Sequence, residues 1–282
     1  MAHEIVESAE SILDVAIPCL DKGFVRLVDY LGGDSRIVQS ARVSYGSGTK
    51  TVREDQGLIN YLMRNHHTSP FEQVILTFHC KMPIFIARQW VRHRTARLNE
   101  ISGRYSVMED EFYLPLPENI RKQSKRNKQA RSEERIGNDT EQEVLDQLEN
   151  EQRMLYAGYT NLIELGVARE IARINLPLSL YTEWYWQIDL HNLFHFLKLR
   201  LDDHAQYEIR VYAEALAQCA KAVAPMAYSA FEEFILHNVS FSRIELQALH
   251  ALLAGEPNPL EGRQRDIFEE KLAKASRLKD YV

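Results

Sequence analysis

Residues 89–105 read QWVRHRTARLNEISGRY, a stretch that crowds arginine and histidine beside a glutamate, a serine and a glycine. Cations this close repel one another, so a fold accepts them where an anion neutralises them or where they point into solvent. The planar guanidinium group of arginine suits a phosphate or a carboxylate. Ser102 adds a hydroxyl group, and Gly103 lets backbone donors approach a ligand. The stretch therefore predicts a pocket for a phosphorylated, hydrogen-bonding small molecule, with a solvated basic helix as the alternative.

The composition around this stretch is that of an ordinary globular protein. The 282 residues, 26% of them charged and 45% hydrophobic, can bury a substantial core in one large domain or two small ones. The net charge of −6 lacks the basic excess that general nucleic-acid binding usually shows. The sequence contains no apolar run of about 18 residues, and no apolar segment follows a basic start. We therefore expect a cytoplasmic protein that does not span a membrane.

The cysteines Cys19, Cys80 and Cys219 are widely spaced and form no CxxC pair. This pattern is typical of reduced thiols in a cytosolic protein. Each of them has a packing explanation, because Cys80 falls in a predicted strand, Cys219 in a predicted helix, and Cys19 has no arginine nearby. We therefore do not expect a thiolate nucleophile.

Hydrophobic patterning in the first half of the chain predicts a helix, a strand and a second helix, at residues 55–65, 74–81 and 84 to about 97. On the second of these helices, Gln89, Arg92 and His93 are three or four positions apart and share a face. That arrangement would bury one side of the helix and offer these polar groups to a ligand.

A dense basic run at residues 121–135 interrupts the pattern in the second half. It has almost nothing apolar to pack, which favours a solvated, mobile insertion over an anion-attracting lid. An aromatic segment at residues 179–189 predicts a further strand. Predicted helices occupy residues 140–165 with Gly166 as the C-cap, 168–175, the segment after Asp189, the segment from an Asp203 cap to about 223, 226–236, and two charged segments within 240–282.

Histidines suggest a metal site as one alternative. His191 and His195 are four positions apart on one helix face near Asp189, and His66 and His67 are adjacent. The chain lacks the glutamate of an HExxH motif and a second evident ligand pair, so we expect no metal. A metal-dependent hydrolase built on these histidines remains one rival interpretation. An RNA-binding protein that uses the basic stretches and aromatic side chains is the other.

The order of residues in the opening stretch resembles the signature of the flavin-dependent thymidylate synthases (ThyX). Arg92-His93-Arg94 is followed after seven residues by Ser102, and the similarity extends through residues 99–100 and 104–105. The family usually has serine where this chain has Arg97. The resemblance covers about residues 35–115 and 155–235. It implies an α+β fold in which a mainly antiparallel central sheet is packed with long helices.

The same resemblance implies a domain organisation and an activity. Residues 1–239 would form one catalytic domain with a basic insertion at about 118–138, and residues 240–282 a C-terminal helical extension. The activity would be the reductive methylation of dUMP to dTMP, with 5,10-methylenetetrahydrofolate as carbon donor and NADPH-reduced FAD as hydride source. Side chains cannot carry a hydride, so a redox cofactor is needed, and the absence of a GxGxxG motif means that FAD would be bound without a Rossmann site. The family resemblance also implies a homotetramer with shared active sites.

Site residues follow from the resemblance, position by position. Those similar to the dUMP-binding set are Gln89, Arg92, Glu100, Ile101, Ser102, Gly103, Arg104, Arg173 and Arg200. Those similar to the FAD-binding set are Ser44, His67, Ser69, Glu72, Arg92, His93, Arg94, Glu100, Asp189, His191 and His195. Arg200 matches the residue that polarises the uracil and is the candidate catalytic residue. Many relatives carry asparagine and arginine where this chain has Asp189 and His191.

Overall fold

The chain divides into two compact units, Met1–Phe231 and Glu232–Val282. The computed structural model describes residues 4–43, 52–125 and 130–277. None of the helices among these residues is both long and apolar enough to cross a membrane.

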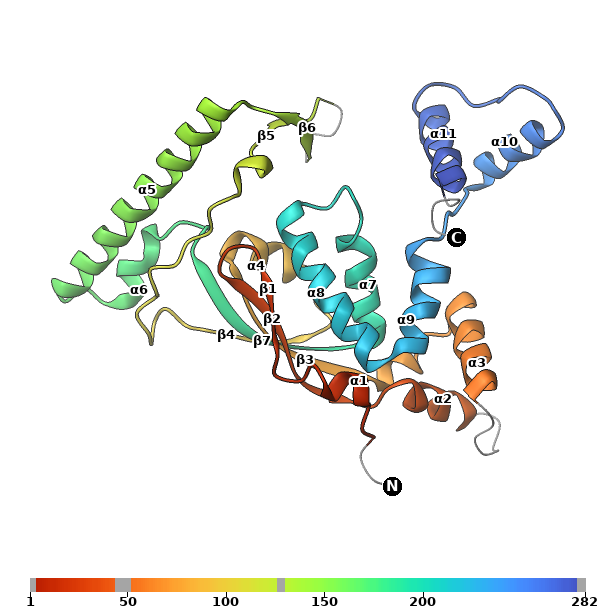
Figure 1. Ribbon diagram of the computed structural model, residues 1–282, viewed down its shortest axis with the longest axis horizontal. Helices are drawn as coiled ribbons and strands as arrows, with labels where there is room; N and C mark the ends of the chain where they lie inside the picture. Colours follow the sequence, from red (N-terminus) through yellow and green to blue (C-terminus); the bar gives the residue numbers. More distant parts are fainter. Residues whose placement is uncertain (1–3, 44–51, 126–129, 278–282) are drawn as a thin grey trace. The chain divides into compact units, whose positions relative to one another are not determined.

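The first unit is organised on an antiparallel sheet, which among the described residues has five strands in the order β1-β2-β3-β7-β4 (Figure 1). Their bounds are Ala16–Cys19 for β1, Gly23–Leu31 for β2, Ile75–Pro83 for β3, Tyr181–Asp189 for β7 and Arg97–Glu100 for β4. The predicted strands at 74–81 and 179–189 are the adjacent pair β3 and β7, and the α+β fold is confirmed.

Alternation along β3 and β7 gives the sheet one buried and one polar face, because successive side chains point to opposite sides. Phe78 and Trp186 are buried on one side. On the other side, His79 lies between Arg26 and Glu183, with its ring nitrogens 2.9 Å from Arg26 Nη2 and 2.9 Å from Glu183 Oε2. The sheet therefore has one buried apolar face that packs against other elements and one polar face that is partly exposed.

Helices α4 (Ile84–Trp90), α7 (Leu190–Arg200) and α8 (Tyr207–Val223) pack on the buried face (Figure 1). Trp90 lies at the centre of this core, with its ring centroid 5.4 Å from that of Trp184 and 5.1 Å from that of Trp186. Each buried aromatic ring of this kind stabilises the fold by about 2–3 kcal/mol. The residues that flank Trp90 in the sequence are therefore held by a rigid core.

The helix predicted from residue 84 to about 97 is wrong in its second half, because α4 ends at Trp90. Residues 97–100 instead form β4, which pairs with residues 184–187 of β7 at the sheet edge. The hydrogen bonds of that ladder come from a segment far along the chain, and they outweigh local helical spacing. Arg92 and His93 therefore lie in the turn after α4 and do not share a helix face with Gln89.

The described residues of the basic run at 121–135 include two strands, which its composition did not predict. They pair as a hairpin of β5 (Arg121–Gln123) and β6 (Arg131–Arg135). Arg131 forms an ion pair with Glu208 of α8 at 3.1 Å, and the Glu208 side chain is only 4% exposed. Charged side chains thus dock this hairpin where apolar ones are scarce.

The remaining helices of the first unit lie around the sheet. They are α1 (Glu7–Glu10), α2 (Asp34–Arg42), α3 (Val52–Arg64), α5 (Asn138–Glu164), α6 (Arg169–Ala172), α9 (Pro225–Phe231), and the short 3-10 turns η2 (Phe71–Gln73), η3 (Pro117–Asn119) and η4 (Arg173–Asn175). Gly166 follows α5 with φ +81°, the left-handed conformation expected of a helix C-cap. Asp203 does not cap α8, whose N-cap is Gln206.

The second unit contains a π-helical turn, η5 (Glu232–Leu236), and the helices α10 (Arg243–Leu253) and α11 (Gly262–Arg277). Ala248, Leu260 and Phe268 form its small core. Ser242 and Glu245 make a capping box at the start of α10. The Glu245 carboxylate also accepts hydrogen bonds from Lys271 Nζ at 2.7 and 2.8 Å, which joins the two helices.

Candidate active site

A cavity of about 340 Å³ lies where the turn after α4 meets α7. Its lining combines cationic side chains with apolar ones. The lining residues are Arg92, His93, Arg94, Thr95, Ile188, Asn192, His195, Leu199 and Arg200. The arginine–histidine motif of the opening stretch and the predicted catalytic residue thus share one cavity.

Arg200 and His93, which both line this cavity, are in direct contact. Arg200 Nε donates to His93 Nε2 at 3.2 Å, and Arg200 Nη2 donates to the Gln89 carbonyl oxygen at 3.5 Å. Burial lowers the pKa of His93 to about 4, helped by the charge of Arg200 and by His195. The imidazole is therefore neutral, and since Nε2 accepts, the proton lies on Nδ1. Burial also lowers the pKa of Arg200.

Asp189 forms the N-cap of α7 and uses its carboxylate locally. Its Oδ1 accepts from the Asn192 backbone nitrogen at 2.9 Å, and its Oδ2 accepts from Asn192 Nδ2 at 2.8 Å. His191 is half-buried on this helix and His195 is exposed. The first two turns of α7 thus place Asn192 and His195 in the lining of the cavity.

The segment around η2 packs against α7. The Phe71 ring lies 6.5 Å from that of Phe194, and the Leu190 backbone nitrogen donates to the Val74 carbonyl oxygen at 2.8 Å. Three predicted cofactor positions occur on this segment, and all three are exposed: His67, Ser69 and Glu72. Ser44, the fourth predicted position in this part of the sequence, lies outside the described residues.

A second cationic group lies beyond β4. A Cβ atom placed on Gly103 would come within 3.0 Å of Met108 Sδ and 3.2 Å of Arg173 Cδ. Arg104 Nε lies 3.3 Å from Glu170 Oε2, in an ion pair that is exposed on both sides. The predicted phosphate ligands Arg104 and Arg173 are therefore close together, although they are distant in the sequence.

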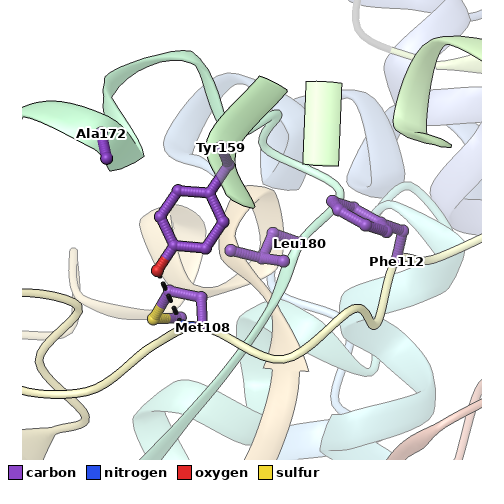
Figure 2. Close-up of a cluster of buried hydrophobic side chains, with 5 residues drawn as sticks. All are labelled: Met108, Phe112, Tyr159, Ala172 and Leu180. Carbon is purple, nitrogen blue, oxygen red and sulfur yellow. Dashed lines mark hydrogen bonds between the residues drawn. The ribbon is translucent and has the colours of Figure 1, made fainter. Parts of the chain in front are cut away.

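Buried side chains hold this loop against α5 and α6 (Figure 2). Met108 donates from its backbone nitrogen to the hydroxyl of Tyr159 at 3.0 Å. The rest of this cluster is apolar and comprises Phe112, Ala172 and Leu180. Because Ala172 adjoins Arg173 in the sequence, the same cluster fixes both sides of the second cationic group.

β4 separates the two cationic groups. Arg94 and Thr95 precede this strand and Ser102 follows it, so the four residues of β4 alone place about 13 Å of extended chain between them. Along the way, Glu100 Oε1 accepts from Thr182 Oγ1 at 2.6 Å, and the Ile101 backbone nitrogen donates to the Glu183 carbonyl oxygen at 2.9 Å. Within one chain, the predicted dUMP-binding residues thus form two groups at opposite ends of β4.

Gln89 has a partner that sequence reasoning did not assign to the site. Gln89 Nε2 donates to Gln206 Oε1 at 2.6 Å, and Gln206 Nε2 donates to Glu208 Oε2 at 2.8 Å. Asn192 also lines the cavity without having been predicted. The only sequence signal for these residues is their place within stretches that already resembled the family.

The charges of the site favour an anion. Among the described residues, Arg92, Arg94, Arg173 and Arg200 form no ion pair with a carboxylate. Cations that lack a protein counterion are suited to binding phosphate groups. By contrast, no group of three or more histidine, cysteine or acidic residues in the described part of the chain is placed to hold a metal ion.

Comparison with known proteins identifies related families. Residues 26–226 match the family model described as thymidylate synthase complementing protein, and residues 239–278 match that of the thymidylate synthase ThyX C-terminal domain. The resemblance is therefore wider than expected, because it crosses the basic hairpin and includes the C-terminal helices.

Individual relatives are similar over most of their length. The flavin-dependent thymidylate synthase of Treponema denticola is 60% identical over 260 residues, covering 92% of this chain and 98% of that protein. The enzyme of the same name from Thermus thermophilus is 60% identical over 242 residues, covering 86% and 87%. Among solved structures, the UMP/dUMP methylase PolB from Streptomyces cacaoi, bound with 5-Br dUMP, is 32% identical with a TM-score of 0.71, covering 78% of this chain and 99% of PolB.

Proposed function

Because this chain belongs to the flavin-dependent thymidylate synthase family, we propose that it makes thymidylate from dUMP with the help of bound FAD. The observation that carries this proposal is the cavity in which Arg92, His93 and Arg94 meet Arg200, whose arginines form no ion pair with any carboxylate of the described residues. Neither rival interpretation, a metal-dependent hydrolase or an RNA-binding protein, is supported by the relatives.

The reaction replaces the hydrogen at C5 of uracil with a methyl group. The carbon comes from 5,10-methylenetetrahydrofolate and the reducing equivalents come from NADPH, so dTMP, tetrahydrofolate and NADP⁺ are the products. When bound, the reduced flavin supplies the hydride that no side chain can carry.

A cysteine nucleophile has no support in this chain. Cys19, Cys80 and Cys219 are all buried. Burial raises the pKa of Cys19 and of Cys219 to about 12, and that of Cys80 well above its ordinary value. Since the thiolate is the reactive form, buried neutral thiols favour a route that relies on the flavin.

The residues around the cavity fit a flavin nucleotide. Its phosphate groups need cations and hydrogen-bond donors, and the lining offers Arg92, Arg94 and the Asn192 amide. The neutral His93 and the exposed His195 add ring nitrogens. In this proposal these residues hold FAD together with His67, Ser69, Glu72, Glu100, Asp189, His191 and Ser44.

The nucleotide substrate would use both cationic groups. Arg104 and Arg173, with Ser102 and Gly103, would hold the phosphate of dUMP, while Gln89, Arg92, Glu100 and Ile101 would bind the rest of the molecule. Arg200 would lie beside the base. A fixed cation next to a ring that gathers negative charge stabilises that charge most where water is scarce.

The separation of these two groups by β4 supports a further proposal, a homotetramer. If one chain supplies the cavity and a neighbouring chain supplies the loop with Arg104 and Arg173, the two groups can face one nucleotide. We also propose that the enzyme acts in the cytoplasm.

The test is spectroscopic and kinetic. The purified protein should show the absorbance of an oxidised flavin and should oxidise NADPH faster when dUMP is added. A colourless protein with bound zinc or iron would favour the hydrolase, and salt-sensitive RNA binding would favour the other rival.

A further inference from the structure

A chain of hydrogen bonds connects Gln89 to the basic hairpin. Gln89 Nε2 donates to Gln206 Oε1 at 2.6 Å, and Gln206 Nε2 donates to Glu208 Oε2 at 2.8 Å. Arg131 of β6 donates to the same carboxylate, from Nη1 at 3.2 Å and from Nη2 at 3.1 Å. The Tyr113 hydroxyl donates to Glu208 Oε1 at 3.1 Å.

The direction of every bond in this chain is fixed by Glu208. A carboxylate only accepts hydrogen bonds, and an arginine only donates them. Gln206 must therefore turn its NH₂ group toward Glu208, which leaves its oxygen facing Gln89. Gln89 in turn must offer its NH₂ group to that oxygen, which leaves its own oxygen, Oε1, free to accept.

We propose that Gln206 and Glu208 are positioning residues that orient Gln89, so that its amide oxygen accepts a hydrogen bond from the bound nucleotide. This inference rests on the proposed function, in which Gln89 binds dUMP. The Gln89 backbone is beside the candidate catalytic residue, because Arg200 Nη2 donates to its carbonyl oxygen at 3.5 Å. An amide with one allowed orientation distinguishes a donor from an acceptor on its ligand, which a freely rotating amide does not.

Two groups on dUMP can donate to such an oxygen, the 3′-hydroxyl of the sugar and the N3–H of uracil. Either one gives the same chemistry at Gln89, so ligand analogues must separate them. The 3′-hydroxyl is missing from 2′,3′-dideoxyuridine monophosphate, and N3-methyl-dUMP has no N3–H.

The basic hairpin supplies Arg131, the residue at the far end of this hydrogen-bond chain from Gln89. Arg131 also donates from Nη1 to the Asn119 carbonyl oxygen at 2.8 Å, and its guanidinium carbon lies 5.7 Å from the centre of the Tyr207 ring. These contacts hold the guanidinium where it can saturate one side of Glu208. A segment that looks like a solvated insertion thus acts on the nucleotide site through two intervening side chains.

The experiment measures, by titration calorimetry on the flavin-loaded protein, the affinity for dUMP and for both analogues. One variant is Gln206→Met, which removes both the NH₂ donor and the oxygen acceptor of the amide. The other is Glu208→Gln, whose side chain can donate as well as accept hydrogen bonds. Tyr113→Phe is the matched control, because it removes a donor from Glu208 without changing the direction of the bonds to Gln206.

We expect the wild-type protein to bind one analogue about tenfold more weakly than dUMP, the value of one well-placed hydrogen bond. The weakened analogue identifies the donor. The ratio of the Kd for the weakened analogue to the Kd for dUMP should fall to about one in Gln206→Met and in Glu208→Gln. In Tyr113→Phe it should stay at about ten. If these residues only support folding, the substitutions should instead weaken the binding of dUMP and of both analogues by the same factor.

Two results would overturn the inference. One is a wild-type protein that binds dUMP and both analogues equally well. The other is an unchanged ratio in both Gln206→Met and Glu208→Gln. Failure of the wild-type protein to bind dUMP at all is a different result, because it would overturn the proposed function and this inference with it.

Discussion

Arg200 Nε donates a hydrogen bond to His93 Nε2 at 3.2 Å, and this contact joins the arginine–histidine motif to the C-terminal end of α7. The bond requires a neutral imidazole, and burial with the adjacent guanidinium provides that state by lowering the pKa of His93 to about 4. The pair therefore keeps the positive charge on Arg200, where the proposed reaction needs it.

The pH dependence of stability should reveal this depressed pKa. Between about pH 6.5 and pH 4, His93 is protonated in the unfolded chain but stays neutral in the folded protein. The free energy of unfolding therefore falls as the pH is lowered through that window. In His93→Gln this contribution is gone. Thermal melting between pH 4 and pH 8 should therefore show a shallower acid-side fall in Tm for His93→Gln, while the exposed His250→Gln control should follow the wild type. Equal slopes for all three proteins would contradict the assignment.

Arg200 should matter more for turnover than for binding. Without its charge beside the uracil, we expect kcat of Arg200→Ala to fall about 100-fold or more. The Kd for dUMP should change by less than about tenfold, because the phosphate is held elsewhere. Arg200→Lys, which restores a charge without the planar donors, should recover part of kcat. Near-normal turnover in Arg200→Ala would remove Arg200 from the catalytic role.

Gly103 should be intolerant of a side chain because of its neighbours. A Cβ atom there would meet Met108 Sδ at 3.0 Å and Arg173 Cδ at 3.2 Å, so Gly103→Ala should displace Arg173 and raise KM for dUMP by about tenfold or more. Gly158→Ala on α5 is the control, since a Cβ atom at Gly158 meets nothing within 4 Å. That helix substitution should stabilise the protein by about 0.5–1 kcal/mol and leave KM unchanged. Equal KM values for dUMP in both variants would contradict the proposal that Arg173 binds the phosphate of dUMP.

Thiol reagents should leave the enzyme active. Cys19, Cys80 and Cys219 are buried, and burial raises the pKa of each thiol, so N-ethylmaleimide should modify them only after unfolding. Mass spectrometry of the native and the unfolded protein, with an activity assay on each treated sample, tests this. Rapid inactivation that accompanies labelling of one cysteine in the native protein would support a thiolate nucleophile instead.

Local patterns predicted the parts of the fold that local chemistry determines. The β-forming runs became β3 and β7, and Gly166 took the left-handed conformation that ends α5. In each case the deciding contacts are within a few residues or depend on simple alternation along a strand.

Contacts between distant residues caused the errors. The helix predicted to run to residue 97 ended early, because β4 pairs with residues of β7 that lie 84 to 90 positions later in the chain. The composition of the basic run did not predict β5 and β6, and Arg131 of β6 pairs with Glu208, which lies 77 positions away. Similarly, Gln89 and Gln206 are 117 positions apart, so no spacing rule could reveal the bond between their amides. The motif predicted the centre of the site, and its supporting residues needed the structure.

The most direct test of the central claim is the release of tritium from dUMP labelled at C5. Replacing that hydrogen with a methyl group must expel it into water. With FAD, NADPH and 5,10-methylenetetrahydrofolate present, we expect the wild-type protein to release tritium and form dTMP in equal amounts, and Arg200→Ala to do so far more slowly. A flavin-loaded protein that binds dUMP yet releases no tritium and forms no dTMP would contradict the account.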